Sequence, residues 1–139
     1  MPLSVTIDAN IQNVFDILNT PQLNNIWNPV THTVTPDKNN PNKCTVVSFM
    51  GNFDTEKTTT EPTNVTLKIN NSPVLKELRY DLVSISSNQT RVHGNVIFAG
   101  TGHYETIHKA VGEKLLNNLK RYVEHHKAGL PDEQFVKEL

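Results

Sequence analysis

The residue with the clearest potential for chemistry is His108, which lies in a segment from Thr106 to Lys127 with helical periodicity. An imidazole titrates near neutral pH, so it can act as a general acid or base, or it can orient a bound molecule. At about 100° per residue, His108 falls near the middle of an apolar helix face that also carries Leu115 and Leu119. The alternative is a structural histidine at the helix entry that bonds a backbone carbonyl or reaches water. His108 is therefore only a weak catalytic candidate, because a reaction needs at least two convergent polar groups.

A second group of residues could surround a bound molecule. Its members are apolar or aromatic and fall on predicted inner faces: Phe15, Trp27, Tyr80, Val111 and Leu115. Aromatic residues at these spacings fit a packed core as well as a pocket wall, and both interpretations stay open. A hollow core would combine the two roles.

The other histidines and the single cysteine offer weaker chemistry. His32 shares strand parity with Val30 and Val34, which predicts an inward side chain that could serve as a polar handle. No histidine pair shares a face with a carboxylate at ligand spacing, so no metal site is predicted. Cys44 has no neighbour in sequence that would stabilise a thiolate. The sequence contains no Gly-rich phosphate loop or other nucleotide motif, and no cofactor is predicted.

Length and composition indicate one domain, expected over residues 1–128, with a charged tail at 129–139 that is ordered only in part. The net charge of -1 predicts no nucleic-acid partner. No segment approaches the roughly 20 apolar residues of a membrane span. One cysteine and the absence of a signal-peptide pattern favour a reduced, cytoplasmic protein. A monomer and a homodimer are both compatible with these features.

The elements that must position the candidate residues alternate along the chain. A strand at Leu3–Ile7 is followed by two short helices, at Ile11–Leu18 and Pro21–Trp27, and then by six strands. The six strands are expected at 30–35, 44–50, 53–60, 65–69, 77–82 and 92–98, with a hairpin turn at 51–52 and a linker at 100–102 before the long helix. Short turns require largely antiparallel strands, and the apolar face of the long helix needs a sheet as partner. The prediction is an α+β fold.

The sequence also predicts the surroundings of one strand and of two glycines. The strand from Cys44 to Met50 is apolar enough to be partly covered on both faces. Gly94 predicts a bulge or a close approach of the helix. Gly112, inside the helix, predicts either close contact with a strand or room for a ligand, because glycine there is unfavourable by roughly 1 kcal/mol.

The chain resembles the START/Bet v1-like superfamily, in the group described as polyketide cyclase/dehydrase and lipid transport proteins (SRPBCC). The resemblance covers residues 2–127 and is carried by the order and spacing of several short stretches. These are residues 5–9 (VTIDA), 14–18 (VFDIL), 27–29 (WNP), 88–92 (NQTRV), and Leu115, Leu116, Leu119, Lys120 and Tyr122 of the closing helix.

This resemblance implies the helix-grip fold, in which a curved seven-stranded antiparallel sheet wraps around the C-terminal helix and two short helices separate the first two strands. It also implies an apolar cavity between helix and sheet that binds or carries a small hydrophobic molecule such as a lipid, a quinone or a polyketide-like compound. Members of the superfamily include cyclases and chaperone co-activators. A cyclase or dehydratase using His108 as acid/base, and a protein-interaction module, are therefore the alternative functions.

Overall fold

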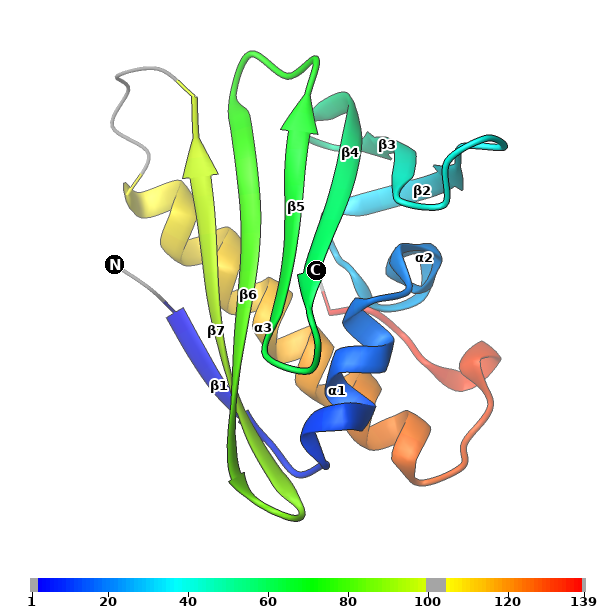
Figure 1. The fold of residues 1–139 in the computed structure, drawn as a ribbon, viewed down its shortest axis with the longest axis vertical. Helices are drawn as coiled ribbons and strands as arrows, with labels where there is room; N and C mark the ends of the chain where they lie inside the picture. Colours follow the sequence, from blue (N-terminus) through cyan, green and yellow to red (C-terminus); the bar gives the residue numbers. More distant parts are fainter. Residues whose placement is uncertain (1–2, 100–104, 139) are drawn as a thin grey trace.

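The computed structural model describes residues 3–99 and 105–138, and it has a curved sheet that wraps one long helix (Figure 1). The predicted linker at 100–102 and His103 lie outside the described residues. In chain order the elements are β1 (Leu3–Ile7), α1 (Ile11–Leu18), η1 (Pro21–Leu23), α2 (Asn24–Trp27), β2 (Thr31–Pro36), β3 (Lys43–Ser48), β4 (Gly51–Thr60), β5 (Asn64–Asn70), β6 (Leu75–Ser86), β7 (Gln89–Phe98), α3 (Glu105–Lys127) and η2 (Asp132–Gln134).

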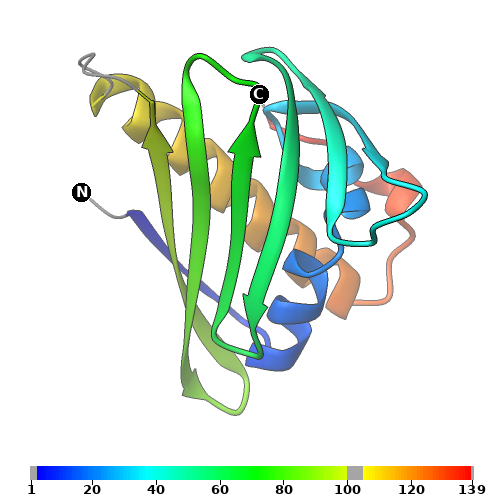
Figure 2. The same ribbon diagram turned by 45° about the horizontal axis from the view of Figure 1, so that its top comes forward.

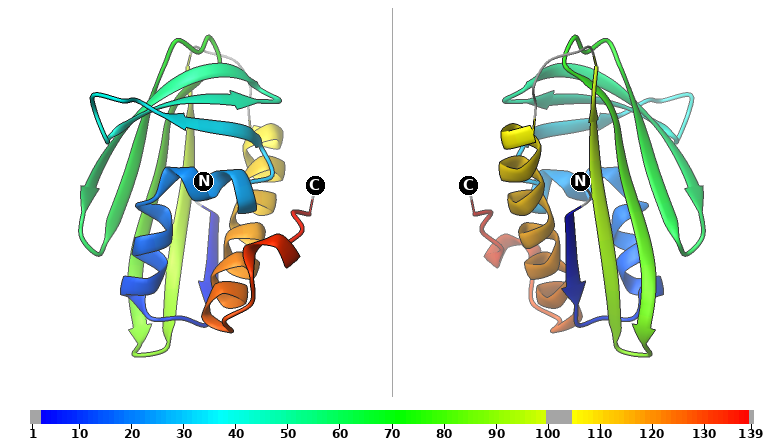
Figure 3. Two further views of the ribbon diagram at one scale, coloured as in Figure 1. Left: turned by 90° about the vertical axis from the view of Figure 1, so that its right-hand side faces the viewer. Right: turned by 90° about the vertical axis from the view of Figure 1, so that its left-hand side faces the viewer.

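The described strands form one seven-stranded sheet in the order β1-β7-β6-β5-β4-β3-β2, and every neighbouring pair is antiparallel. The sheet bends so that β2 and β3 cross above the helices (Figures 2 and 3). Helix α3 packs on β1 and β7, and α2 packs on β2 at the opposite end of the strand order. This arrangement is the predicted helix-grip α+β fold.

Side-chain alternation explains why one face of this sheet is buried. In β5 the side chains of Val65, Leu67 and Ile69 are buried, whereas Lys68 and Asn70 between and after them are exposed. Two clusters of buried apolar residues result. The larger joins α1, α3, β1 and the β6–β7 end of the sheet, and the smaller consists of Val34, Cys44, Val46, Phe53, Ile69 and Leu75. The second cluster lies where the sheet curves.

The short helix α1 is fixed at both ends. The Asn10 side chain caps its N-terminus by accepting a hydrogen bond from the Gln12 backbone N–H at 2.8 Å. At the other end, the Lys57 ammonium of β4 donates to the carbonyl oxygen of Asn19 at 2.7 Å. These contacts hold the helical segment Ile11–Trp27 against the concave side of the sheet.

Helix α3 buries only part of the face that periodicity predicts. Leu115, Leu119 and Val123 are at most 3% exposed, but Ile107 in the first turn is 45% exposed. The helix therefore packs tightly from its middle onward. Its first turns stand farther from the core.

The two internal glycines mark close approaches between α3 and the sheet. A Cβ atom at Gly94 in β7 would lie 3.2 Å from the Leu116 side chain, and one at Gly112 would overlap the Leu3 side chain of β1. Contact with a strand, one of the two explanations predicted for Gly112, is therefore the observed one. Gly94 likewise marks a close approach of the helix.

The β3–β4 hairpin differs from the prediction in two ways. Ser48 pairs with Gly51, so the turn consists of Phe49 and Met50 and not of Gly51 and Asn52. The Ser48 hydroxyl fixes this turn, because it accepts from the Met50 N–H at 3.1 Å and donates to the Gly51 carbonyl oxygen at 2.7 Å. The prediction that the 44–50 strand is covered on both faces is also wrong, since burial alternates strictly along β3.

The inward orientation predicted for His32 is wrong. The register of β2 against β3 shifts between Thr31 and Thr33, which is the signature of a β-bulge or similar irregularity. As a result Thr31 and Val34 are buried, whereas His32 and Thr33 are exposed. The alternation of inward and outward side chains breaks at such an irregularity, so counting through it assigned His32 to the wrong face of the sheet.

The C-terminal tail, residues 130–138, packs against the rest of the chain. It turns at Gly129, which has a φ of 76°, and runs back along α3 (Figure 3). The Tyr122 hydroxyl donates to Asp132 at 3.0 Å, and the Arg121 guanidinium donates to the Val136 carbonyl oxygen at 3.1 Å. Lys137 then reaches β2, where its ammonium donates to the Thr31 carbonyl oxygen at 2.9 Å. The prediction of a tail ordered only in part is therefore corrected for residues 130–138.

Candidate functional site

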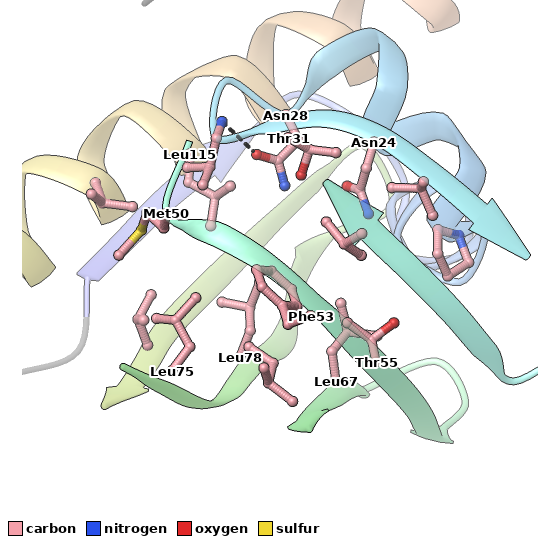
Figure 4. A pocket seen from close by; sticks show the side chains of 17 residues that line it. Asn24, Asn28, Thr31, Met50, Phe53, Thr55, Leu67, Leu75, Leu78 and Leu115 are labelled. Carbon is pink, nitrogen blue, oxygen red and sulfur yellow. Dashed lines mark hydrogen bonds between the residues drawn. The ribbon is translucent and has the colours of Figure 1, made fainter. Parts of the chain in front are cut away.

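A small cavity lies inside the bend of the sheet, between α3, α2 and strands β2 to β7 (Figure 4). Its volume is about 60 Å³, which is room for roughly two water molecules. Seventeen residues line it: Pro21, Asn24, Asn28, Val30, Thr31, Val34, Val46, Met50, Phe53, Thr55, Leu67, Ile69, Leu75, Leu78, Val96, Val111 and Leu115.

The wall of this cavity is mainly hydrocarbon, because the second core cluster forms its floor. Phe53, Leu67 and Leu75 project from the sheet, and Leu115 faces them from α3 (Figure 4). Met50, from the β3–β4 turn, is only partly buried. Its flexible thioether side chain is the part of this wall that rearranges most easily.

Four neutral polar side chains interrupt the apolar wall: Asn24, Asn28, Thr31 and Thr55. The Asn28 carboxamide oxygen accepts a hydrogen bond from the Val30 N–H at 2.9 Å, and the Thr31 N–H donates to the Asn28 carbonyl oxygen at 3.3 Å. Asn28 and Thr31 therefore belong to one turn between α2 and β2. Thr55 lies on the opposite wall, beside Phe53 (Figure 4).

The described lining contains no acidic, basic, histidine, cysteine or tyrosine side chain. Cys44 is buried in the same second core cluster but does not line the cavity, and burial raises the pKa of its thiol. Within the described part of the chain, His, Cys, Asp and Glu side chains form no group that could hold a metal ion. In 3–99 and 105–138, no helix is long and apolar enough to cross a membrane.

Two of the predicted contact residues, Val111 and Leu115, line the cavity. Phe15, Trp27 and Tyr80 do not, and all three are buried in the larger core cluster with at most 2% exposure. Burial raises the pKa of the Tyr80 hydroxyl above its ordinary value. For these aromatic residues the structure favours the core interpretation.

His108 lies near the cavity but does not line it. Its Nε2 accepts a hydrogen bond from the Val96 N–H at 3.2 Å, and its ring meets Phe98 edge to face, with 6.4 Å between centroids. Burial lowers the pKa of the imidazole, and the bond from Val96 requires an unprotonated Nε2. His108 thus joins the start of α3 to β7. This is a structural role, but its partner is a backbone N–H and not the predicted backbone carbonyl or water.

The sequence analysis predicted none of the four polar side chains that line the cavity. Thr55 carried a usable signal, because it shares strand parity with Phe53 on the buried face of β4. Asn28 entered the sequence analysis only within the stretch 27–29 that carries the resemblance, not as a lining residue. Thr31 was not predicted to line the cavity, because the irregularity in β2 changes the face on which its side chain lies.

No family model matches the sequence, and no curated protein matches it significantly. Solved structures do match its fold. A START superfamily protein from Mycobacterium smegmatis superimposes with a TM-score of 0.71 at 17% identity, covering 91% of this chain and 97% of that chain. The chain has the START/Bet v1-like fold.

Two other similar structures show the breadth of this superfamily fold. The Zhui aromatase/cyclase from a Streptomyces species has a TM-score of 0.71 at 12% identity, covering 94% of this chain and 98% of that chain. Ara h 8.0201 has a TM-score of 0.60 at 12% identity, covering 89% and 96%. The predicted resemblance is therefore confirmed for the fold. Identities this low do not transfer an activity.

Proposed function

We propose that this protein binds a small hydrophobic molecule in the cavity between α3 and the sheet. The observation that carries the proposal is the composition of the lining, in which thirteen of the seventeen residues are hydrocarbon or thioether and four are neutral and polar. Burial of apolar ligand surface would supply affinity, and the few polar groups would fix orientation. A lipid, a quinone or a polyketide-like compound fits this description.

The size of the cavity limits how such a ligand binds. Sites for drug-sized molecules have volumes on the order of 300–1,000 Å³, whereas this one holds about 60 Å³. A larger ligand must therefore extend through an opening or displace wall side chains such as Met50. We propose that binding is accompanied by such an expansion.

A cyclase or dehydratase activity with His108 as acid/base has less support. The described lining offers no titratable group, and Nε2 of His108 is already engaged by the Val96 N–H. A protein-interaction role through the tail also has less support, because residues 130–138 pack on their own α3. Cytoplasmic location remains a prediction.

The test is ligand uptake measured by native mass spectrometry, with a panel of lipids, quinones and aromatic polyketides. Leu115→Trp should fill the cavity and abolish uptake. Lys114→Trp is the matched control, because Lys114 is the exposed neighbour on the same helix and does not line the cavity. Equal uptake by both variants would show that ligands do not enter this cavity. A panel with no binder at all would contradict the proposed function.

A further inference from the structure

Three polar side chains in the cavity wall are nine-tenths buried and have atoms that no described residue satisfies. Asn28, Thr31 and Thr55 are 6%, 7% and 5% exposed. The Asn28 oxygen is held by the Val30 N–H, so its amide nitrogen Nδ2 is the group left over. Among the described residues, no hydrogen bond reaches Nδ2 of Asn28 or the hydroxyl of Thr31 or Thr55. None of these three atoms is completely enclosed, because the fully buried side-chain polar atom without a partner in the described chain is Trp27 Nε1. The Asn28 amide nitrogen is directed into the cavity (Figure 4).

These groups are available to a partner inside the cavity. Buried polar groups in native proteins are almost always hydrogen-bonded, because an unsatisfied one loses its hydration without compensation. The orientation of Asn28 is not free to adapt, since turning its amide would break the bond to Val30. Whatever occupies this part of the cavity therefore meets an N–H donor from Asn28 and hydroxyl groups from both threonines.

The charge of the lining restricts the occupant further. No charged side chain lines the described cavity, so a carboxylate, phosphate or ammonium group would be buried without a counter-charge. Lys137 approaches this region from the tail. Its ammonium, however, bonds the Thr31 carbonyl oxygen at 2.9 Å, and Lys137 does not belong to the lining.

We propose that the cavity selects an uncharged ligand with a carbonyl oxygen, which accepts hydrogen bonds from Asn28 Nδ2 and the Thr31 hydroxyl. The hydrocarbon part of this ligand lies along Phe53, Leu75 and Leu115. This inference rests on the proposed function and names the ligand class of the same site. Amides, esters and ketones satisfy it, whereas free fatty acids and amines do not.

The test compares head groups on one apolar body. Acetophenone, α-methylstyrene and benzoate share a phenyl ring and differ in carrying a ketone, its alkene isostere and a carboxylate. The naphthyl counterparts repeat the comparison with a larger body. Binding is measured by NMR titration, and the side-chain amide signal of Asn28 reports on the contact directly. We expect the ketone to bind roughly three- to tenfold more tightly than the alkene, benzoate to bind most weakly, and the Asn28 amide signal to shift only with ketones.

Two substitutions complete the test. Thr31→Val removes the hydroxyl at nearly constant volume and should abolish most of the preference for ketone over alkene. Thr33→Val is the matched control, because Thr33 is on the same strand but exposed. Equal binding of ketone and alkene, or tightest binding of benzoate, would overturn this inference and leave the proposed function standing. Failure of all six compounds to bind would overturn both.

Discussion

The side-chain amide of Asn118 pairs with the backbone of Glu138 in the tail. Its Nδ2 donates to the Glu138 carbonyl oxygen at 2.9 Å, and its Oδ1 accepts from the Glu138 N–H at 2.8 Å. Asn118 is completely buried, and Nδ2 also donates to the Lys114 carbonyl oxygen of its own helix at 2.8 Å. A polar residue on the inner part of α3 is thus explained by the tail, not by the cavity.

Asn118→Leu should detach the end of the tail. The substitution leaves the Glu138 N–H and carbonyl groups without partners, and we expect a loss of about 1–3 kcal/mol in the free energy of unfolding. Urea denaturation measures this loss, and hydrogen exchange should show faster exchange at residues 136–138. Asn117→Leu is the control, because Asn117 is exposed and donates a hydrogen bond to the Glu138 carboxylate, at 3.2 Å, and not to the tail backbone. Similar losses in the two variants would contradict this role of Asn118.

Phe135 is the apolar anchor of the tail. Its ring meets Tyr122 and His125 edge to face, with centroid distances of 5.3 and 5.4 Å, and the Arg121 guanidinium lies 5.0 Å from its centre. Phe135→Ala should lower the free energy of unfolding by on the order of 1–2 kcal/mol, since aromatic pairs add to simple burial. Its neighbour Val136 is 71% exposed, so Val136→Ala should have little effect. Thermal and urea unfolding of the two variants would separate these expectations.

Gly112 and Leu3 should be energetically coupled. In the wild type, a Cβ at position 112 overlaps the end of the Leu3 side chain, which must move. In a Leu3→Ala background the Leu3 side-chain atoms no longer occupy this space. Gly112→Ala should then raise the free energy of unfolding by up to about 1 kcal/mol, because alanine favours the helix over glycine. A double-mutant cycle of unfolding free energies measures the coupling. An identical effect of Gly112→Ala in both backgrounds would show that Leu3 does not restrict this position.

Regular strand alternation made much of the fold predictable. In β5, for example, Val65, Leu67 and Ile69 set one buried face without reference to the rest of the chain. The irregular strand β2 could not be predicted in this way, because its register shift between Thr31 and Thr33 depends on pairing with β3. That single shift moved His32 from the predicted inner face to the surface and brought Thr31 into the cavity wall.

The tail and the polar part of the site were harder to predict because their determinants are not local. The charged composition of 129–139 favoured partial order, whereas the contacts that hold the tail come from Asn118, Arg121 and Tyr122 on α3. Val111 and Leu115 were predictable as lining residues because helical period alone places them on the inner face. Asn28 contributes through a turn whose geometry the sequence does not display.

Met50 should limit the size of the ligand. It lines the cavity from the β3–β4 turn, and Met50→Ala removes three heavy atoms from the wall. We expect affinity for the larger of two homologous ketones to rise on the order of tenfold relative to the smaller, as is typical for methylene-sized changes in apolar pockets. Phe49→Ala is the control in the same turn, since Phe49 is 62% exposed and does not line the cavity. Calorimetric titration of both variants measures the ratio, and an unchanged ratio in Met50→Ala would remove Met50 from the wall that restricts size.

The pairing of His108 with the Val96 N–H predicts a pH dependence of stability. Burial lowers the pKa of folded His108 below its ordinary value of 6.5, so the unfolded chain binds more protons as the pH falls below about 6.5. The stabilisation from neutral His108 is therefore present above that pH and is lost as the pH falls through the folded pKa. The free energy of unfolding of the wild type should decrease relative to that of His108→Gln between pH 7.5 and pH 5.5. An NMR titration of the His108 ring provides the direct measurement, and a folded pKa at or above 6.5 would show that the imidazole is free to protonate and would reopen its assignment as an acid/base group.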